Sequence, residues 1–374
     1  MPEIWFWQVI ISPHMADLAV VLARRGCKIT YVAQRAMSVE RAKQGWKAPT
    51  LPGVTLQLAD SSAAVKMLVE QASADSIHIC QGVRANGSVG LAQTALAARG
   101  LRQWVVMESV NDSGWRGAFK RMEYSRIFRA REKSLQGVLA TGYRTVDWVV
   151  ARGVPSDKVY PFAYFLPDRM DRAVRDQRKP GPIRFLFAGQ LIPRKRVDWL
   201  VNVLADLMDQ SFELWIVGAG PEEAALRSLA AGKLGNRVRW LGQLSLPDVP
   251  AVMAQADCLV LPSMHDGWGA VASEALMVGT PVICSDACGV AGVVKASGAG
   301  GVFGVSDSAE LHRLLDKQCK EGIVDTVTRV GLKEWASCLG SIAGANYLLK
   351  ILASLTDQAV YRVAAPWHSS KGRQ

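Results

Sequence analysis

Apolar runs of strand length alternate with helical patterns along the first half of the chain. Buried parallel strands are typically such continuous apolar runs, with helices between them. The runs cover residues 3–11, 28–34, 54–60, 76–83, 102–109 and 137–142. This alternation predicts a parallel, doubly wound sheet.

The alternation restarts after a polar, basic stretch at 165–185, which carries Pro-Gly-Pro near its end and has the composition of a linker. Further strands are predicted at 183–189, 212–220, 237–244, 258–263 and 281–286. A chain of 374 residues is also longer than one core usually supports. We therefore expect two domains.

The predicted fold class is α/β, with two Rossmann-like doubly wound domains facing a cleft. Ligands of such sheets bind beyond the carboxyl ends of the strands. The loops after Gly189, Gly218 and Pro262 should therefore line one crevice. The expected divisions are an amino-terminal domain at 1–168, a linker at 169–182, a carboxyl-terminal domain at 183–345, and a helix and tail at 346–374 that pack back on the first domain.

Charge and cysteine content narrow the class of protein. The formal net charge of +11 favours anionic partners such as nucleotides or acidic lipids. The seven cysteines are scattered through apolar runs without a CxxC pair, which is typical of free thiols in a reducing cytoplasm. The start has no basic region before its apolar run, so it is interpreted as a strand rather than a signal peptide. We expect a cytoplasmic protein without a membrane span.

One stretch places two acidic residues around a glycine pair. "PSMHDGWGAVASEAL" at 262–276 follows a predicted strand and leads into a predicted helix. Gly267 and Gly269 allow backbone amides to approach a ligand closely, and the amino end of the helix favours an anion. Asp266 lies just before the helix and Glu274 a little over one turn inside it. A ligand with both phosphates and hydroxyls would suit this pattern.

A basic run follows another predicted strand. Arg194, Lys195 and Arg196 stand between the strand at 183–189 and a helix, where cations suit a diphosphate. A solvated helix face is the alternative. In "VGAGPEEAAL", Glu223 occupies the place of the last glycine of a dinucleotide fingerprint, so this loop does not fit a nicotinamide cofactor.

From about 183 to 286 the sequence resembles the retaining glycosyltransferases of family four, which have the GT-B fold. Their hallmark is two acidic residues separated by seven positions after a "PS" strand end. Asp266 and Glu274 match this spacing, and Gly267, Trp268 and Gly269 fill the glycine-aromatic-glycine slot. "GQLIPRKRVDWL", "VGAGP", "VRWLG" and "TPVICSD" follow in the family's order.

The resemblance implies roles for particular residues. Lys195, Asp266 and Glu274 would be catalytic, with Glu274 accepting hydrogen bonds from the ribose. The donor phosphates would be bound by Gly189, Gln190, Arg194, Lys195, Arg196, Gly267, Trp268 and Gly269. The nucleoside would lie near Gly218, Leu241, Gln243 and Leu244. The resemblance also implies retention of anomeric configuration without a metal ion, and no cofactor, since the nucleoside-diphosphate sugar is a substrate.

Candidates for the acceptor side come from the amino-terminal half. His14 follows the first strand, Glu108 ends another, and Arg84 and Arg116 lie in polar loops after strands. His78 lies inside an apolar run and is interpreted as a packed core residue.

The segment 114–134 interleaves basic and aromatic residues on a predicted helix. This pattern indicates a membrane-surface element facing anionic lipid, and an ordinary amphipathic helix with a solvated basic face is the alternative. No recognised nucleic-acid-binding fold or motif is present.

Together these features predict a cytoplasmic enzyme, peripheral on the inner face of the membrane. It would transfer a sugar from a nucleoside-diphosphate donor to a glycan or lipid-linked acceptor in cell-surface polysaccharide biosynthesis. Two alternatives stay open. Asp266 in place of the family's Glu, and Gln190 in place of its Arg, suit a catalytically weakened partner subunit; a nucleotide-sugar epimerase shares the fold.

Overall fold

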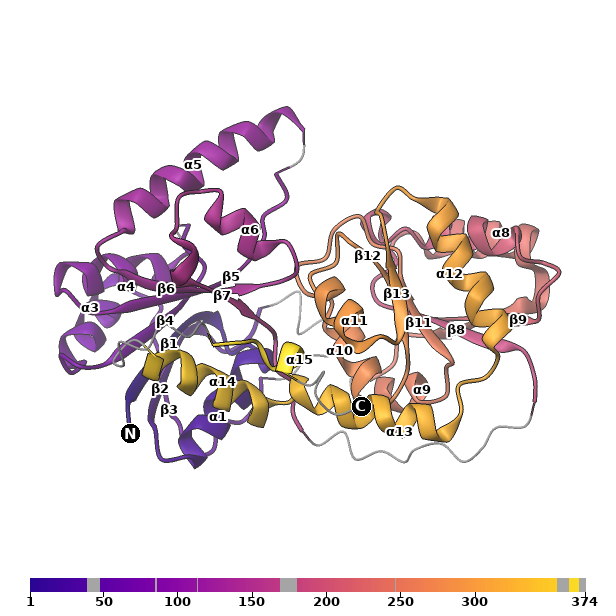
Figure 1. The fold of residues 1–374 in the computed structure, drawn as a ribbon. Helices are drawn as coiled ribbons and strands as arrows, with labels where there is room; N and C mark the ends of the chain where they lie inside the picture. Colours follow the sequence, from indigo (N-terminus) through magenta and orange to yellow (C-terminus); the bar gives the residue numbers. More distant parts are fainter. Residues whose placement is uncertain are drawn as a thin grey trace. The chain divides into compact units, whose positions relative to one another are not determined.

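The computed structural model describes residues 1–38, 48–84, 86–112, 114–168, 180–245, 247–354 and 363–369. The chain forms two compact units (Figure 1). Unit 1 comprises 1–167 and 340–366, and unit 2 comprises 168–339 and 367–374. The divisions lie at 167 and 340, and the sequence analysis expected boundaries at 168 and 345. Most of the predicted linker lies outside the described residues.

Unit 1 is built on a seven-stranded sheet whose paired strands are all parallel. The strands are β1 (Glu3–Ile10), β2 (Lys28–Arg35), β3 (Thr55–Leu58), β4 (Ile77–Gln81), β5 (Gln103–Glu108), β6 (Leu135–Thr141) and β7 (Val159–Phe162). They are joined or covered by α1 (Pro13–Arg24), α3 (Ser62–Gln71), α4 (Ser88–Ala98), α5 (Trp115–Arg131), α6 (Thr145–Val150), the short η1 (Ser156–Lys158) and α14 (Ser341–Ser354).

Unit 2 repeats the design with six parallel strands. They are β8 (Ile183–Ala188), β9 (Phe212–Val217), β10 (Val238–Gly242), β11 (Cys258–Leu261), β12 (Val282–Ser285) and β13 (Gly300–Phe303). The helices are η2 (Pro193–Lys195), α7 (Val197–Ala205), α8 (Glu223–Leu234), η3 (Gly235–Arg237), α9 (Val249–Met253), α10 (Ala270–Met277), α11 (Ala291–Ser297), α12 (Ser308–Glu321), α13 (Thr326–Ala336), η4 (Ser337–Leu339) and α15 (Pro366–Ser369), which begins at the end of unit 1.

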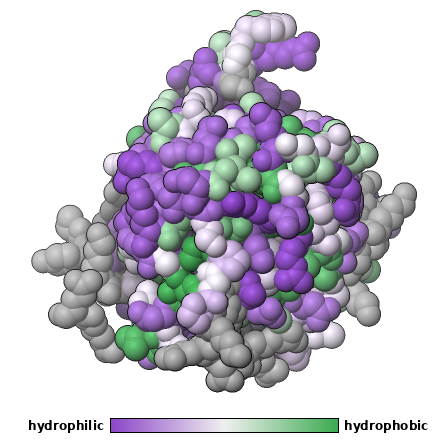
Figure 2. All heavy atoms as spheres, turned by 90° about the vertical axis from the view of Figure 1, so that its right-hand side faces the viewer, coloured by the Kyte–Doolittle hydropathy of each residue, from purple (hydrophilic) through white to green (hydrophobic). Residues whose placement is uncertain are grey.

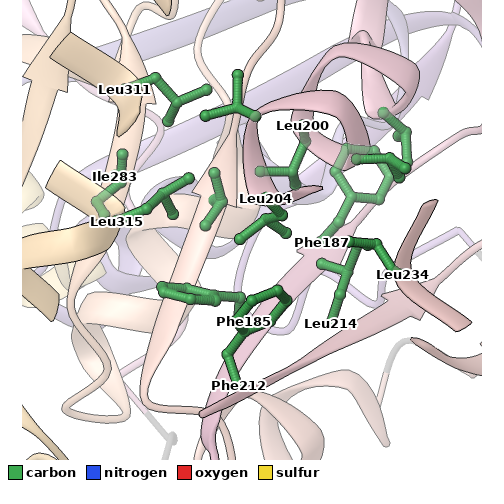
Figure 3. Packing of buried hydrophobic residues seen from close by; sticks show 14 of the residues in the cluster. Phe185, Phe187, Leu200, Leu204, Phe212, Leu214, Leu234, Ile283, Leu311 and Leu315 are labelled. Carbon is green, nitrogen blue, oxygen red and sulfur yellow. The ribbon is translucent and has the colours of Figure 1, made fainter. Parts of the chain in front are cut away.

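The apolar runs became strands because both faces of each sheet are covered by helices. In unit 2, Phe185 and Phe187 of β8 pack with Leu200 and Leu204 of α7 and with Leu214 of β9 (Figure 3). Burying one such side chain stabilises the fold by ~1.5–3 kcal/mol. The predicted α/β class with doubly wound parallel sheets is confirmed.

The structure confirms that His78 is a core residue. It is fully buried on β4, where its Nδ1 accepts a hydrogen bond from the Trp7 indole at 3.0 Å. Burial lowers its pKa to about 3, so this histidine is neutral at physiological pH.

The face drawn in Figure 2 is mostly hydrophilic, and its apolar residues lie in small separate patches. Among the described residues, no helix has the length and apolar character needed to cross a membrane. Scattered apolar residues on such a face are normal for a folded protein.

Each sheet has a point at which the order of its strands reverses. In unit 2 the order is β10-β9-β8-β11-β12-β13, so the chain changes direction between β8 and β11. In unit 1 the corresponding neighbours are β1 and β4. The loops that leave two such strands diverge at their carboxyl ends and leave a crevice for a ligand.

Candidate active site

Lys195 and Asp266 form an ion pair at the switch point of unit 2. Lys195 ends the loop after β8, and Asp266 lies in the loop after β11. The ammonium group donates a hydrogen bond to Oδ2 of Asp266. Their side chains are 11% and 17% exposed, so the pair is shielded from most of the solvent yet open to a ligand. The structure thus brings together two of the three predicted catalytic residues.

The backbone of Asp266 is fixed by the loop after β12. Its amide donates to the carbonyl of Ala287 at 3.2 Å, and its carbonyl accepts from the amide of Gly289 at 2.9 Å. A Cβ on Gly289 would lie 1.9 Å from the carbonyl oxygen of Gly267, so only glycine allows this approach. Sequence reasoning missed this clamp, and the only signal was a glycine among small residues.

The three consecutive cations point to different partners. Arg194 is exposed, and its Nη1 donates to the carbonyl of His265 at 3.0 Å and lies 4.0 Å from the carboxylate of Asp266. The Arg196 guanidinium donates to the carbonyl of Val305 and lies 3.8 Å from the ring centroid of Trp199. Arg194 and Lys195 therefore form the basic edge beside Asp266, while Arg196 holds its own loop.

The loops after β8, β9 and β10 are joined side by side. The amide of Gly189 donates to Val217 at 3.0 Å, and the amide of Gly218 donates to Gly242 at 2.8 Å. A Cβ on Gly218 would lie 1.8 Å from the carbonyl oxygen of Gly189. Gly218 is thus required for loop packing, which is a sufficient reason for this glycine. The side chain of Gln190 is exposed in the loop after β8.

Glu274 lies one turn into α10, as the sequence predicted. Gly269, with φ of 90°, is the N-cap residue of α10, and no side-chain hydrogen bond caps the amino end of this helix in the described part of the chain. Glu274 is half-buried, and desolvation raises the pKa of its carboxyl to about 7. Within the described parts of the chain, neither a hydrogen-bond donor nor a cation contacts this carboxylate. It is an acceptor that a ligand hydroxyl could satisfy.

Trp268 faces the interior rather than the loop surface. Its indole nitrogen donates to the Ser273 hydroxyl at 3.1 Å, and the side chain is almost fully buried. The ring of Trp367, also buried, lies 6.4 Å away between centroids. Trp268 therefore anchors the glycine-rich loop, and any direct contact of Gly267 and Gly269 with phosphate would come from the backbone. Trp367 gave no signal in the sequence.

The residues predicted near the nucleoside lie at the end of β10. Leu241 is half-buried within the strand, and Gly242 has φ of 66° where the strand register shifts. Gln243 is exposed and Leu244 half-buried in the loop that follows. Like Gly218 after β9, these residues lie at the carboxyl ends of the strands, and their strand β10 is two strands from β8.

Three of the four predicted acceptor-side residues contact a named neighbour. The ring of His14 stacks on Tyr164 with centroids 4.9 Å apart, and Arg84 pairs with Glu123 of α5 at 3.0 Å. The guanidinium of Arg116 lies 5.0 Å from the Trp115 ring centroid, and Glu108 is half-buried at the end of β5. Their acceptor role stays a prediction.

Residues 170–329 match the family model described as glycosyl transferases group 1. The chain is 32% identical over 170 residues to 2-deoxystreptamine glucosyltransferase of Streptomyces kanamyceticus, covering 44% of this chain and 42% of that protein. It is 36% identical over 130 residues to phosphatidyl-myo-inositol mannosyltransferase of Mycobacterium leprae, covering 34% of each.

Residues 170–329 thus carry the sequence pattern of the glycosyl transferases group 1 family. This match confirms the resemblance to group 1 glycosyltransferases, while membership of family four and retention of configuration stay predictions. The match spans less than half the length of these curated relatives. The substrates in their names are therefore statements about those proteins alone.

The solved structure of HepE from Anabaena in complex with UDP shares the fold along nearly the whole chain. The TM-score is 0.72 at 14% identity, covering 94% of this chain and 100% of that chain. At this identity the likeness shows the fold, which is GT-B.

Proposed function

We propose that the protein is a glycosyltransferase that moves a sugar from a nucleoside-diphosphate donor to a hydroxyl of a glycan or lipid-linked saccharide. The observation that carries this proposal is the Lys195–Asp266 pair at the switch point of a group 1 domain. Glu274, a half-buried acceptor on the helix that follows, supports it. Lys195, Asp266 and Glu274 are the proposed catalytic residues.

The proposed chemistry is electrostatic. Transfer breaks the bond between the sugar and the diphosphate, and negative charge grows on the departing phosphate oxygen. Lys195 and Arg194 would stabilise that charge, because cations preorganised in a shielded site lower a barrier more than cations in water. Ribose hydroxyls would donate to Glu274. Asp266, fixed by its backbone, would face the sugar.

Two finer features rest on the resemblance to family four. We propose that the anomeric configuration is retained and that no metal ion takes part, since Lys195 and Arg194 supply the positive charge. Unchanged turnover in EDTA and a product anomer equal to that of the donor are the expected results. A requirement for Mg²⁺ would contradict the second feature.

Two other functions remain open. A weakened subunit would bind nucleotide without turnover, and Gln190 and Asp266 are the features that favour it. An epimerase would convert the nucleotide sugar without an acceptor. A product assay run with and without acceptor separates all three possibilities.

Calorimetry with UDP, GDP and ADP tests the donor site directly. We expect one nucleotide to bind with micromolar affinity, with EDTA present or absent, and to bind weakly to Lys195→Ala and Glu274→Ala. Lys233→Ala, an exposed change on α8, is the matched control. Absence of binding to all three nucleotides would contradict the enzyme proposal and favour a structural partner.

We also propose that the enzyme works on an anionic membrane surface. Trp115, Phe119 and Met122 of α5 are 73%, 62% and 46% exposed and share one helical stripe. Gly117, Tyr124 and Phe128 form the buried face of the same helix. The long α5 can be followed in Figure 1. An exposed apolar stripe with basic neighbours is typical of interfacial helices.

Vesicle flotation tests the membrane proposal. We expect the protein to float with anionic vesicles and less with pure phosphatidylcholine, and Trp115→Ser with Phe119→Ser to reduce flotation about tenfold or more. Val327→Ser and Ile342→Ser, at two other exposed apolar positions, are the controls. Equal loss in both double variants would contradict a specific role for α5.

A further inference from the structure

A cavity in unit 1 lies at the amino ends of the strands, and the predicted acceptor side lies at their carboxyl ends. It has a volume of about 160 Å³. Its walls come from the second half of α5, the start of β6 and the chain between α6 and β7. The acceptor-side residues follow the carboxyl ends of the strands, whereas these walls lie at the amino ends of β6 and β7. The cavity is therefore a separate feature.

Three cations and one carboxylate line this cavity. They are Arg129, Arg152, Lys158 and Glu132. Among the described residues, no acidic side chain forms an ion pair with Arg129 or Lys158. The cavity thus has an excess of positive charge that the described protein does not neutralise.

Arg152 is fixed in place by two hydrogen bonds, and one of its nitrogens has no hydrogen-bond acceptor among the described residues. Its side chain is 8% exposed, and its Nη2 donates to the Asp112 carboxylate at 2.6 Å. Nη1 donates to the carbonyl of Trp148 at 3.0 Å, and the guanidinium carbon lies 4.2 Å from the Trp148 ring centroid. Its buried Nε has no hydrogen-bond acceptor in the described protein. Such a group is costly unless something accepts its hydrogen bond.

We propose that this cavity binds a phosphate monoester. A phosphate offers several acceptor oxygens and a charge of about −1.5 to −2 at neutral pH, which suits the three cations of the wall, Arg129, Lys158 and Arg152. Ser125, also in the wall, can donate a further hydrogen bond. The phosphate is carried either by a lipid headgroup or by a small soluble molecule.

The helix itself connects the cavity to the membrane proposal. Arg126 and Arg129 are exposed and continue the helical stripe of Trp115, Phe119 and Met122 at spacings of three and four. The exposed Lys133 follows in the turn after α5. Arg129 belongs both to that stripe and to the cavity wall. A phosphate headgroup could therefore enter the cavity while the apolar residues contact the acyl region.

The test compares two double variants that remove equal charge. Arg129→Gln with Lys158→Gln removes two cavity cations, and Arg126→Gln with Lys133→Gln removes two cations outside the cavity on or beside α5. Calorimetry with glycerol 3-phosphate probes the soluble source. Flotation with vesicles of one part phosphatidic acid to four parts phosphatidylcholine probes the lipid source. All measurements use the full chain, and calorimetry is repeated in the Lys195→Ala background to exclude the donor site.

We expect affinity for at least one probe to fall about tenfold or more in the cavity variant. The other variant should bind glycerol 3-phosphate with unchanged affinity, and it should lose clearly less vesicle binding than the cavity variant, since its two cations lie on or beside the exposed stripe but outside the cavity. Loss of glycerol 3-phosphate binding identifies a soluble ligand, and loss of vesicle binding alone identifies a headgroup. Equal losses in both variants, or no binding of either probe, would overturn the proposal. Nucleotide binding should be unchanged in the cavity variant, so failure here is distinguishable from failure of the transferase proposal.

Discussion

The ammonium group of Lys195 is paired with the carboxylate of Asp266, 71 residues away along the chain. The carboxylate of Asp266 thus neutralises the positive charge that the diphosphate of the proposed donor would need. A bound donor must therefore share Lys195 with Asp266 or displace it. The pair predicts opposite effects for the two residues on nucleotide affinity.

Asp266→Asn should bind the nucleoside diphosphate about tenfold more tightly, because a competing negative charge is removed. Lys195→Ala should bind it about tenfold or more weakly. Both variants should lose sugar transfer, by about 10²–10³-fold for the loss of one preorganised charge. Calorimetry and initial rates measure the two effects. Arg194→Gln should weaken binding less than Lys195→Ala does, because the Arg194 side chain is exposed, and Lys233→Ala on α8 should leave the affinity unchanged.

The contrary result is informative. If Asp266→Asn weakens nucleotide binding as much as Lys195→Ala, the carboxylate serves mainly to position the lysine.

The raised pKa of Glu274 predicts that donor binding depends on pH. In the proposed donor site, ribose hydroxyls would donate to the ionised carboxylate, so binding would require the proton to leave. With a pKa of about 7 in the free protein, affinity for a nucleotide sugar should rise about tenfold between about pH 6 and pH 8. A nucleotide sugar is the appropriate probe because its phosphates are diesters that do not titrate in this range. A flat profile for wild type would disagree with this role, and Glu274→Gln should give one.

The same carboxylate should make folding stability fall as pH rises. Its pKa is about 7 in the fold against an ordinary value of 4.5, so the folded state binds the proton more tightly than the unfolded state. The effect is absent below about pH 4.5, develops as pH rises to about 7 and is complete above it. It lowers the free energy of unfolding by up to about 3 kcal/mol.

Glu274→Gln should therefore raise the melting temperature of unit 2 by several degrees at about pH 8 and by much less at about pH 4.5. Differential scanning calorimetry at the two pH values measures this difference. An equal change at both would show that ionisation of Glu274 is not the cause.

Gly289→Ala should damage both stability and turnover. The new Cβ would lie 1.9 Å from the carbonyl oxygen of Gly267, which is backbone and cannot move without shifting the Asp266 loop. We expect a loss of about 3 kcal/mol or more in stability. Gly232→Ala in α8 meets nothing within 4 Å and should stabilise the helix by about 0.5–1 kcal/mol. Chemical denaturation and transfer rates measure both variants; normal turnover in Gly289→Ala would contradict the clamp.

Most of the strands were predictable because their apolar runs are buried on both faces, and burial requires apolar side chains at contiguous positions. Strand β3 is an exception, since Thr55–Leu58 is exposed along its whole length. β1, β5 and β9 begin and end close to the runs that predicted them. The short Val159–Phe162 strand β7 and Gly300–Phe303 strand β13 gave no such signal, since four residues at a sheet edge carry little apolar pattern.

The donor-side site was predictable for a similar reason. Asp266, Gly269 and Glu274 lie within nine consecutive positions, so a strand end, a loop and a first helical turn already fix their order in space. The acceptor side has no such local motif. Arg84, chosen for its position after a strand, forms an ion pair with Glu123 of α5, a contact that no local pattern indicates.

The sequence by itself determined which segments form most of the strands, where the loops proposed to bind phosphate begin, and that Glu274 lies one turn inside a helix. These properties depend on neighbours along the chain. Only the tertiary structure decided that Lys195 contacts Asp266, that Gly289 clamps that loop, and that Arg152 lines a basic cavity. Those contacts join segments separated by many residues, and they depend on the strand order and on the distances that packing imposes.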